Sequence, residues 1–210
     1  MRNVNSKTAP GRRDRERQQR REHILAAAER VFGRTPFDEA SMQQIAAEAE
    51  MGMQGLYGHF SSKQALYESV VLHRLEALAR QADASPSGKD PLARLRGLAV
   101  LYAGFFVEAP QFLSLYARHK LTYDWGLQSR FSSQLDRALG REEKRVARAL
   151  DGAVAAGALL PLDRRLLADL ATAIFQAVMA HRVLREREGG VEECADRMIA
   201  LFLKGAGAAP

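Results

Sequence analysis

Apolar residues recur along the chain at spacings of three and four positions, which is the period of an amphipathic helix. The first stripe covers residues 24–34, and two short stripes cover 41–48 and 52–57. A longer stripe follows, and Ser61 or Ser62 can cap its start. No convincing pair of strands and no internal repeat interrupts this pattern. The sequence therefore predicts an all-α fold.

The segment "ADASPSGKDP" is the clearest linker-like stretch, because it is rich in residues that break helices. The apolar stripes after it are longer than those before it, which indicates a second domain. The expected organisation is a flexible basic arm (1–19), a helix-turn-helix domain (20–66, motif 41–60), a connecting helix (67–81), a linker (82–91) and a C-terminal helical domain (92–205).

The two short stripes have the layout of a helix-turn-helix motif. Ser41 is a good N-cap, and Gln44 three residues later completes a capping-box pattern. A joint of about three residues, 49–51, separates this helix from the next. Two short helices after a tight turn, with a third helix before them, are typical of proteins whose second helix enters the DNA major groove.

Composition sets limits on the class of protein. Of the 210 residues, 47% are hydrophobic, which is enough for a buried core. The one cysteine, Cys194, excludes an intrachain disulfide and a thiolate zinc site. No apolar run reaches the length of a membrane span and the N-terminus does not resemble a secretory signal. We expect a soluble, cytoplasmic protein without a cofactor or metal.

The net charge of +6 is concentrated at the N-terminus. Residues 1–22 hold eight Lys and Arg against three acidic side chains, a net +5. Basic arms commonly bind polyanions, and Arg20 or Arg21 could reach the DNA backbone or an adjacent minor groove. The alternative is a solvated tail with no partner.

The segment "GMQGLYGHF" holds the candidate DNA-reading residues. Gly52 and Gly55 would let DNA approach closely. Gln54 suits the edge of adenine and Met53 the methyl group of thymine. Tyr57, His59 and Lys63 have groups suited to phosphate oxygens, and Phe60 is expected in the core. The alternatives are that Tyr57 is a half-buried aromatic residue, that His59 is an ordinary surface histidine, and that Met53 and Gln54 are exposed without a function.

Residues 24–66 resemble the DNA-binding domain of the TetR family of transcriptional regulators. The matching strings are "IL-x-x-A-x-x-x-F", "S-M-x-x-I-A" and "L-Y-x-H-F-x-S-K-x-x-L". The chain departs from the family at Glu50, where a turn glycine is usual, and at Gly52, where a serine cap is usual. It also departs at the pair Gln54–Gly55 and at Pro36. The resemblance implies DNA contacts at Ser41, Gln43, Gly52, Met53, Gln54, Gly55, Tyr57, His59 and Lys63.

The resemblance also implies a C-terminal domain that binds a small apolar effector and forms a homodimer. The last two helices, expected over 166–188 and 191–203, would pack against a second copy. Effector binding would tilt the helix over 62–80 and release a palindromic operator. The candidate effector residues are Tyr102, Phe105, Phe106, Phe112, Tyr116, His119, Trp125, Phe131, Phe175, Gln176 and Met179. The alternative is that these residues form a well-packed core without an effector site.

Two other classes of protein remain open at this point. An enzyme would need a recognisable constellation, yet the sequence has no HExxH, Walker A, GxSxG or dinucleotide-binding motif. A helical scaffold that binds only proteins fits the composition but does not explain the string over 41–63. Of the three, the DNA-binding regulator explains the most residues.

Overall fold

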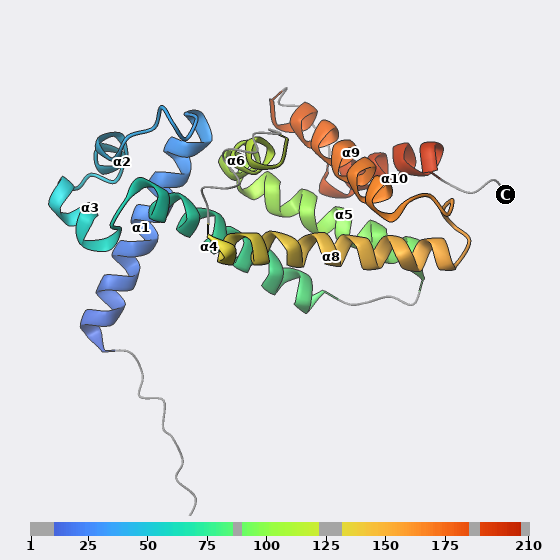
Figure 1. Ribbon diagram of the computed structural model, residues 1–210, viewed down its shortest axis with the longest axis horizontal. Coiled ribbons are helices and arrows are strands. Elements are labelled where there is room, and N and C mark those ends of the chain that lie inside the picture. The colour runs from blue at the N-terminus through green and yellow to red at the C-terminus, as the bar shows by residue number, and fades with distance from the viewer. Residues whose placement is uncertain (1–10, 86–89, 122–131, 185–189, 207–210) are drawn as a thin grey trace, which may run out of the picture. The chain divides into compact units, whose positions relative to one another are not determined.

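The computed structural model describes residues 11–85, 90–121, 132–184 and 190–206, with side chains described except at 117–121, 183–184 and 206 (Figure 1). These residues form α-helices joined by turns and contain no β-strand, which confirms the all-α prediction. The chain divides into two compact units, Met1–Val70 and Val71–Pro210. The division lies within the predicted connecting helix.

Unit 1 holds three helices and the beginning of a fourth. They are α1 (Arg12–Arg34), α2 (Met42–Glu48), α3 (Met53–His59) and the first turns of α4 (Lys63–Ala84). The rings of Phe32, Phe37 and Tyr67 meet between α1, the α1–α2 connection and α4, with centroids 5.1 to 6.2 Å apart. Ile24, Ile45, Leu56 and Leu66, one from each of the four helices, are also fully buried. Each helix of unit 1 thus contributes to one core.

The helix α1 begins earlier than the apolar pattern predicts. Residues 12–19, expected in the flexible arm, are helical, so only 1–10 of that arm lie outside the described residues. Arg12 Nε pairs with Glu16 Oε1 at 2.8 Å, and Gln18 donates to Glu22 at 2.9 Å. Charged residues with long side chains favour helix, and pairs at i, i+4 stabilise it without a buried face.

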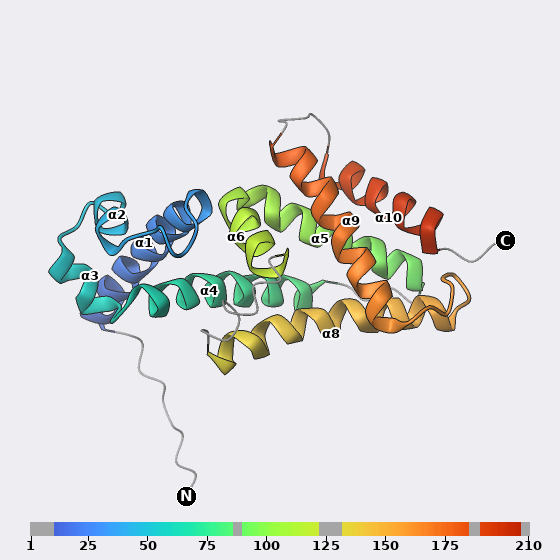
Figure 2. The same ribbon diagram turned by 45° about the horizontal axis from the view of Figure 1, so that its top comes forward.

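Unit 2 holds the end of α4 and five further helices. They are α5 (Pro91–Glu108), α6 (Pro110–Leu121), α8 (Ser133–Ala155), α9 (Arg164–Leu184) and α10 (Val191–Ala206). The helix α5 contacts α8 and α10, and α9 contacts α8 and α10 (Figure 2). A core cluster joins α5, α8, α9 and α10 through Leu95, Leu150, Leu167 and Phe202.

Specific residues end and start these helices. Asp90 accepts from the N–H groups of Leu92 and Ala93, both at 3.1 Å, and caps α5. Asp163 caps α9 in the same way and accepts from the N–H groups of Arg165 and Leu166. Gly157 follows α8 with φ of 73°, the left-handed geometry that glycine adopts without strain.

No single helix in the described ranges is long and apolar enough to cross a membrane. The helix α5 and the beginning of α6 together have the length and composition, but they are bent by 110° at the break between them.

Glu50 stands in the turn between α2 and α3 with φ of 49°. It is the one non-glycine residue in the described part of the chain with a positive φ. The Cβ atom of a non-glycine residue makes this left-handed backbone conformation unfavourable by roughly 1–2 kcal/mol. The resemblance in the sequence makes glycine the expected residue here, and the backbone at Glu50 has a conformation suited to glycine.

Replacing Glu50 with Gly should stabilise the protein by about 1 kcal/mol, because the left-handed conformation then costs little. Denaturant unfolding of the full chain, followed by circular dichroism, measures the change. The control Glu50→Gln removes the charge but keeps Cβ, and its stability should match the wild type. Equal stability of both variants would contradict the prediction.

Candidate functional site

The helices α2 and α3 form the predicted helix-turn-helix. Ser41 Oγ accepts from the Gln44 N–H at 3.2 Å, and Gln44 Oε1 accepts from the Ser41 N–H at 2.8 Å. This confirms the capping box. Gly52 caps α3 without a side chain, so the second helix starts at Met53 and ends at His59, beyond the predicted end at residue 57.

The helix α3 has a buried side and an open side. Leu56 is fully buried, and Phe60, directly after the helix, is 4% exposed, so Phe60 is a core residue as predicted. The exposed residues are Gln54, Gly55, Tyr57 and Gly58, while Met53 is half-buried. The candidate base-reading residues therefore lie on a surface that another molecule can reach.

Glycine recurs at every third position of this segment, at Gly52, Gly55 and Gly58. A Cβ at Gly52 or Gly58 would meet no atom within 4 Å, and one at Gly55 would lie 3.1 Å from the flexible end of Met51. The packing of unit 1 therefore does not require glycine at 52 or 58. The missing side chains matter on the exposed surface, where a bound molecule can approach the backbone of this segment.

Contacts from α1 hold the turn before α3, and the sequence pattern did not predict them. His23 Nε2 lies 3.1 Å from the carbonyl oxygen of Ala49. Glu48 pairs with Arg30 and Arg34, both at 2.6 Å. Hydrogen bonds from these two guanidinium groups lower the pKa of Glu48. The i, i+4 spacing of Arg30 and Arg34 was visible in the sequence, but their partner on α2 was not.

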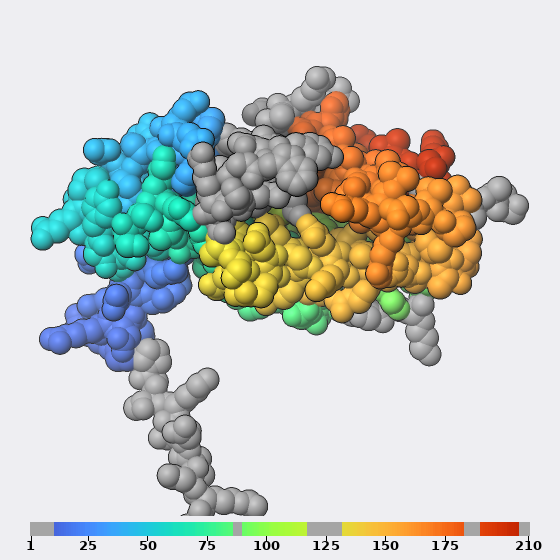
Figure 3. Space-filling model, in the orientation of Figure 1, coloured from blue at the N-terminus to red at the C-terminus, as the bar shows by residue number. Residues whose placement is uncertain are grey.

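A cluster of positive charge lies beside the end of α3. Burial and then repulsion from Arg17, Arg20 and Arg21 lower the pKa of His59. Arg21 also stacks over the ring of Phe60, with its guanidinium carbon 5.2 Å from the ring centroid. Residues 11–20 are all exposed, and the first turns of α1 project from the rest of unit 1 (Figure 3, deep blue). The charges of Arg20 and Arg21 therefore act directly on His59.

Lys63 is placed differently from the prediction. Its ammonium group donates to the carbonyl oxygens of Phe37 (2.7 Å), Asp38 (3.3 Å) and Ala40 (2.7 Å). It also lies 4.7 Å from the centroid of the Phe37 ring. An ammonium has three N–H donors, so these bonds use all of them. In the free protein Lys63 thus fixes the α1–α2 connection, and the predicted contact with a phosphate would require Lys63 to give up one of these bonds.

Two predicted contacts lie at the beginning of α2. Gln43 is exposed in the first turn. Ser41 is half-buried, and its hydroxyl also donates to Gln44 Oε1 at 3.1 Å, so its side chain is engaged in the cap. Among the described residues, no group of three His, Cys, Asp or Glu side chains could hold a metal ion.

The predicted effector residues of unit 2 form an aromatic cluster. Phe106 lies at its centre, with ring centroids of neighbouring aromatics 5.4 to 5.7 Å away. Those neighbours are Phe105, Phe112, Tyr116 and Phe175, and Tyr102 joins through Phe175 at 6.2 Å. Trp125, Phe131 and the side chain of His119 lie outside the described residues.

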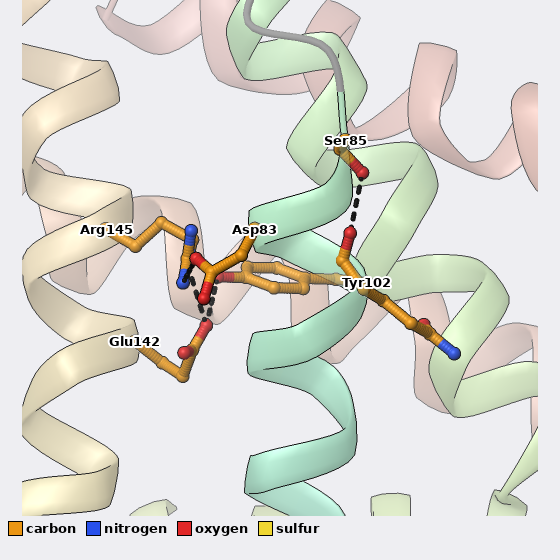
Figure 4. Close-up of polar contacts among 6 residues, drawn as sticks. Asp83, Ser85, Tyr102, Glu142 and Arg145 are labelled. Atoms are coloured by element: carbon orange, nitrogen blue, oxygen red, sulfur yellow. Dashed lines mark hydrogen bonds and ion pairs between the residues drawn. The ribbon is translucent and has the colours of Figure 1, made fainter. Parts of the chain in front are cut away.

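A chain of polar groups leads from these rings to the surface. The Tyr102 hydroxyl donates to Glu142 Oε2 at 3.0 Å, and Arg145 bridges Glu142 (3.3 Å) and Asp83 (2.8 Å) (Figure 4). Burial, followed by the negative charge of Glu142 and the hydrogen bond to it, raises the pKa of Tyr102. The sequence did not single out Glu142, because nothing in a charged stretch of α8 marks one glutamate as buried.

Gln176 and Met179, two predicted effector residues on α9, are both buried. Met179 is fully buried. Gln176 is 6% exposed, and neither its amide nitrogen nor its oxygen has a hydrogen-bond partner in the described part of the chain. Burial of an unpaired amide costs about 1–3 kcal/mol, so a native site with one calls for an explanation.

The N-terminal residues match a known family. Residues 24–70 match the profile of "Bacterial regulatory proteins, tetR family". The HTH-type transcriptional repressor NicS of Pseudomonas putida is 34% identical to this chain over 130 residues. That alignment spans 61% of this chain and 59% of the length of NicS. The N-terminal region is therefore similar to the tetR family, and the alignment with NicS covers less than two thirds of that repressor.

Solved TetR structures match the fold of both units. A TetR-like transcriptional regulator from Rhodococcus sp. RHA1 is 25% identical, with a TM-score of 0.67, over 94% of this chain and 98% of the other. A TetR family transcription regulator from Marinobacter aquaeolei VT8 is 19% identical, with a TM-score of 0.71, over 93% of this chain and 100% of the other. The TetR fold therefore extends into the C-terminal helices.

Replacing Lys63 with Met should lower the stability of the free protein by about 2 kcal/mol, because carbonyl oxygens lose charged donors. Denaturant unfolding of the full chain measures this. The exposed Arg17, changed to Gln, is the control, and its stability should stay within about 0.5 kcal/mol of the wild type. Wild-type stability of Lys63→Met would contradict the structural role.

His59 should titrate below its ordinary pKa in the free protein, and its pKa should rise when phosphates neutralise the neighbouring arginines. Folding disfavours the protonated ring, so stability falls as the pH drops below about 6.5. DNA binding takes up a proton and strengthens as the pH drops. An NMR titration of His59, with and without non-specific duplex DNA at low salt, measures both values. An unchanged pKa on DNA addition would place His59 away from phosphates.

Proposed function

We propose that this protein is a homodimeric TetR-family transcriptional repressor that releases a palindromic DNA operator when a small apolar effector binds in unit 2. The observation that carries the proposal is the exposed face of α3, where glycines leave the backbone accessible beside the arginines of α1. The P. putida relative is named a repressor, which supports repression over activation.

The exposed residues of α3 divide into base-reading and phosphate-binding groups. Gln54 offers the donor and acceptor that match adenine, and Met53 offers apolar contact to the methyl group of thymine. Tyr57, 51% exposed, and His59 bind phosphates, with Arg20 and Arg21 supplying positive charge. Ser41 and Gln43, at the start of α2, approach the sugar-phosphate backbone of the DNA. Gly52 and Gly55 permit the close contact.

Exposed leucines on α9 and α10 support dimer formation. Leu166 is 48% exposed and Leu170 is 39% exposed, one turn apart on α9, and Leu201 on α10 is 48% exposed. The exposed stripe on α9 continues through the small residues Ala173 and Ala177. A second copy related by a two-fold axis would bury these side chains. The two α3 helices would then face successive major grooves, roughly 34–36 Å apart.

The helix α4 is the element that would connect effector and operator. It begins in unit 1 and ends in unit 2, and its last turn carries Asp83, which pairs with Arg145 on α8. Arg145 in turn contacts Glu142 within the aromatic cluster. An effector that displaces these groups would move the end of α4. Its tilt would then change the spacing of the recognition helices.

In vitro selection from a random pool of duplex DNA tests the proposed function directly. The full-length protein should enrich a palindrome whose half-sites lie about 10–10.5 base pairs, or a multiple of that, from centre to centre. Failure to enrich any sequence would favour a scaffold that binds only proteins.

A Leu170→Lys variant tests the dimer in the same selection. A charge in the buried interface should yield a monomer in analytical ultracentrifugation and enrich only single half-sites. Leu160, 38% exposed in the turn after α8, provides the matched control, and Leu160→Lys should stay dimeric. A dimeric Leu170→Lys protein would rule out this face.

Linkage tests the switch. A compound found by thermal-shift screening should lower operator affinity by the same factor as the operator lowers affinity for the compound. Isothermal titration with and without the selected operator measures both factors. Equal affinity for the compound in both titrations would mean that it does not act on DNA release.

A further inference from the structure

Glu142 is a buried carboxylate with a free oxygen. It is 6% exposed on α8, and buried carboxylates are rare unless their oxygens are paired. Its Oε2 accepts from the Tyr102 hydroxyl at 3.0 Å and from Arg145 Nε at 3.3 Å. Its Oε1 has no hydrogen-bond partner among the described residues. One oxygen of the carboxylate is thus held by two donors, and the other is buried without a partner among the described residues.

The positive charge beside Glu142 is shared with a second carboxylate. Arg145 contacts Glu142 and also pairs at 2.8 Å with Asp83, whose side chain is 71% exposed (Figure 4). The next charged residues along α8, Arg141, Glu143 and Lys144, are exposed, and water screens them. The unpaired Oε1 of the buried Glu142 carboxylate favours a strong N–H donor, and hydrogen bonds from a charged nitrogen to a carboxylate are the strongest of this kind.

The surrounding rings favour the same chemistry. Tyr102 contacts Phe175, and Phe175 contacts Phe106, at centroid distances of 6.2 and 5.5 Å. The faces of aromatic rings are negative and attract cations, and flat ligands stack on them. Gln176, directly after Phe175, has an unpaired buried amide that could bind a second polar group. An anionic ligand would instead be repelled by the unpaired carboxylate oxygen.

We infer that the effector is an arylalkylamine, a flat aromatic ring joined through an alkyl carbon to a protonated nitrogen, and that this nitrogen donates to Glu142 Oε1. The inference rests on the proposed function, because it assigns a ligand class to the same effector site. Tyr102 and Arg145 are positioning residues, since they hold the second oxygen of the carboxylate. The aromatic cluster supplies the stacking surface.

Three probes with the same ring separate the contributions of shape and charge. They are naphthylmethylamine, naphthylmethanol and naphthoate, which are cationic, neutral and anionic at neutral pH. Isothermal titration into the full-length wild-type protein should give the tightest binding for the amine and the weakest for naphthoate. This order needs no variant, so it tests the inference even if a substitution prevents folding.

Glu142→Gln then tests the contact. It keeps the shape of the side chain and removes its charge, so amine affinity should fall about tenfold while naphthylmethanol affinity changes little. Glu143→Gln, which removes the same charge from the exposed neighbour, is the matched control and should bind the amine like the wild type. Circular dichroism confirms that each variant is folded.

Three results would overturn the inference. Naphthoate could bind the wild type as tightly as the amine, Glu142→Gln could keep the amine preference, or none of the probes could bind. Failure of the proposed function is a separate outcome, because the DNA selection measures it without any ligand. A protein that enriches an operator but ignores the amine refutes the ligand class alone.

Discussion

The bonds from Lys63 to the α1–α2 connection fix the part of unit 1 on which the proposed DNA recognition depends. The ammonium group binds the carbonyl oxygens of Phe37 and Ala40 at 2.7 Å, and a third at Asp38. Those residues lead into α2, whereas Lys63 begins α4. One side chain therefore fixes the start of α2 against the start of α4. The helix α3 lies between these two fixed points in the chain.

The helix α3 needs this support because it is weak by itself. It has seven residues, two of them glycine, and each glycine costs roughly 1 kcal/mol in a helix. Its position comes from Leu56 and Phe60 in the core, from His23 at the turn and from the pairs of Glu48 with α1. Stability is thus supplied by the neighbouring helices, which leaves the outer face of α3 exposed.

Unit 2 combines an apolar core with a buried polar group that a core does not require. Leu95, Leu150 and Phe202 form an ordinary packed cluster between helices. Glu142 and Gln176 are buried elsewhere in the unit, and each has unpaired polar atoms within the described ranges. Such atoms weaken a purely structural core. Their retention beside aromatic rings is what a ligand-binding function would explain.

The sequence by itself determined the all-α fold, the capping box of Ser41 and the buried place of Phe60, because these depend on local spacing. It also identified the segment of α3, because the resemblance to the TetR family runs through consecutive residues there. It missed the helix over 12–19, which is stabilised by charged pairs rather than an apolar stripe. Only the tertiary structure decided that Lys63 binds carbonyl oxygens, that Glu48 pairs with α1 and that Glu142 is buried. Each of these contacts joins residues that are far apart in the sequence, so no local sequence pattern predicts it.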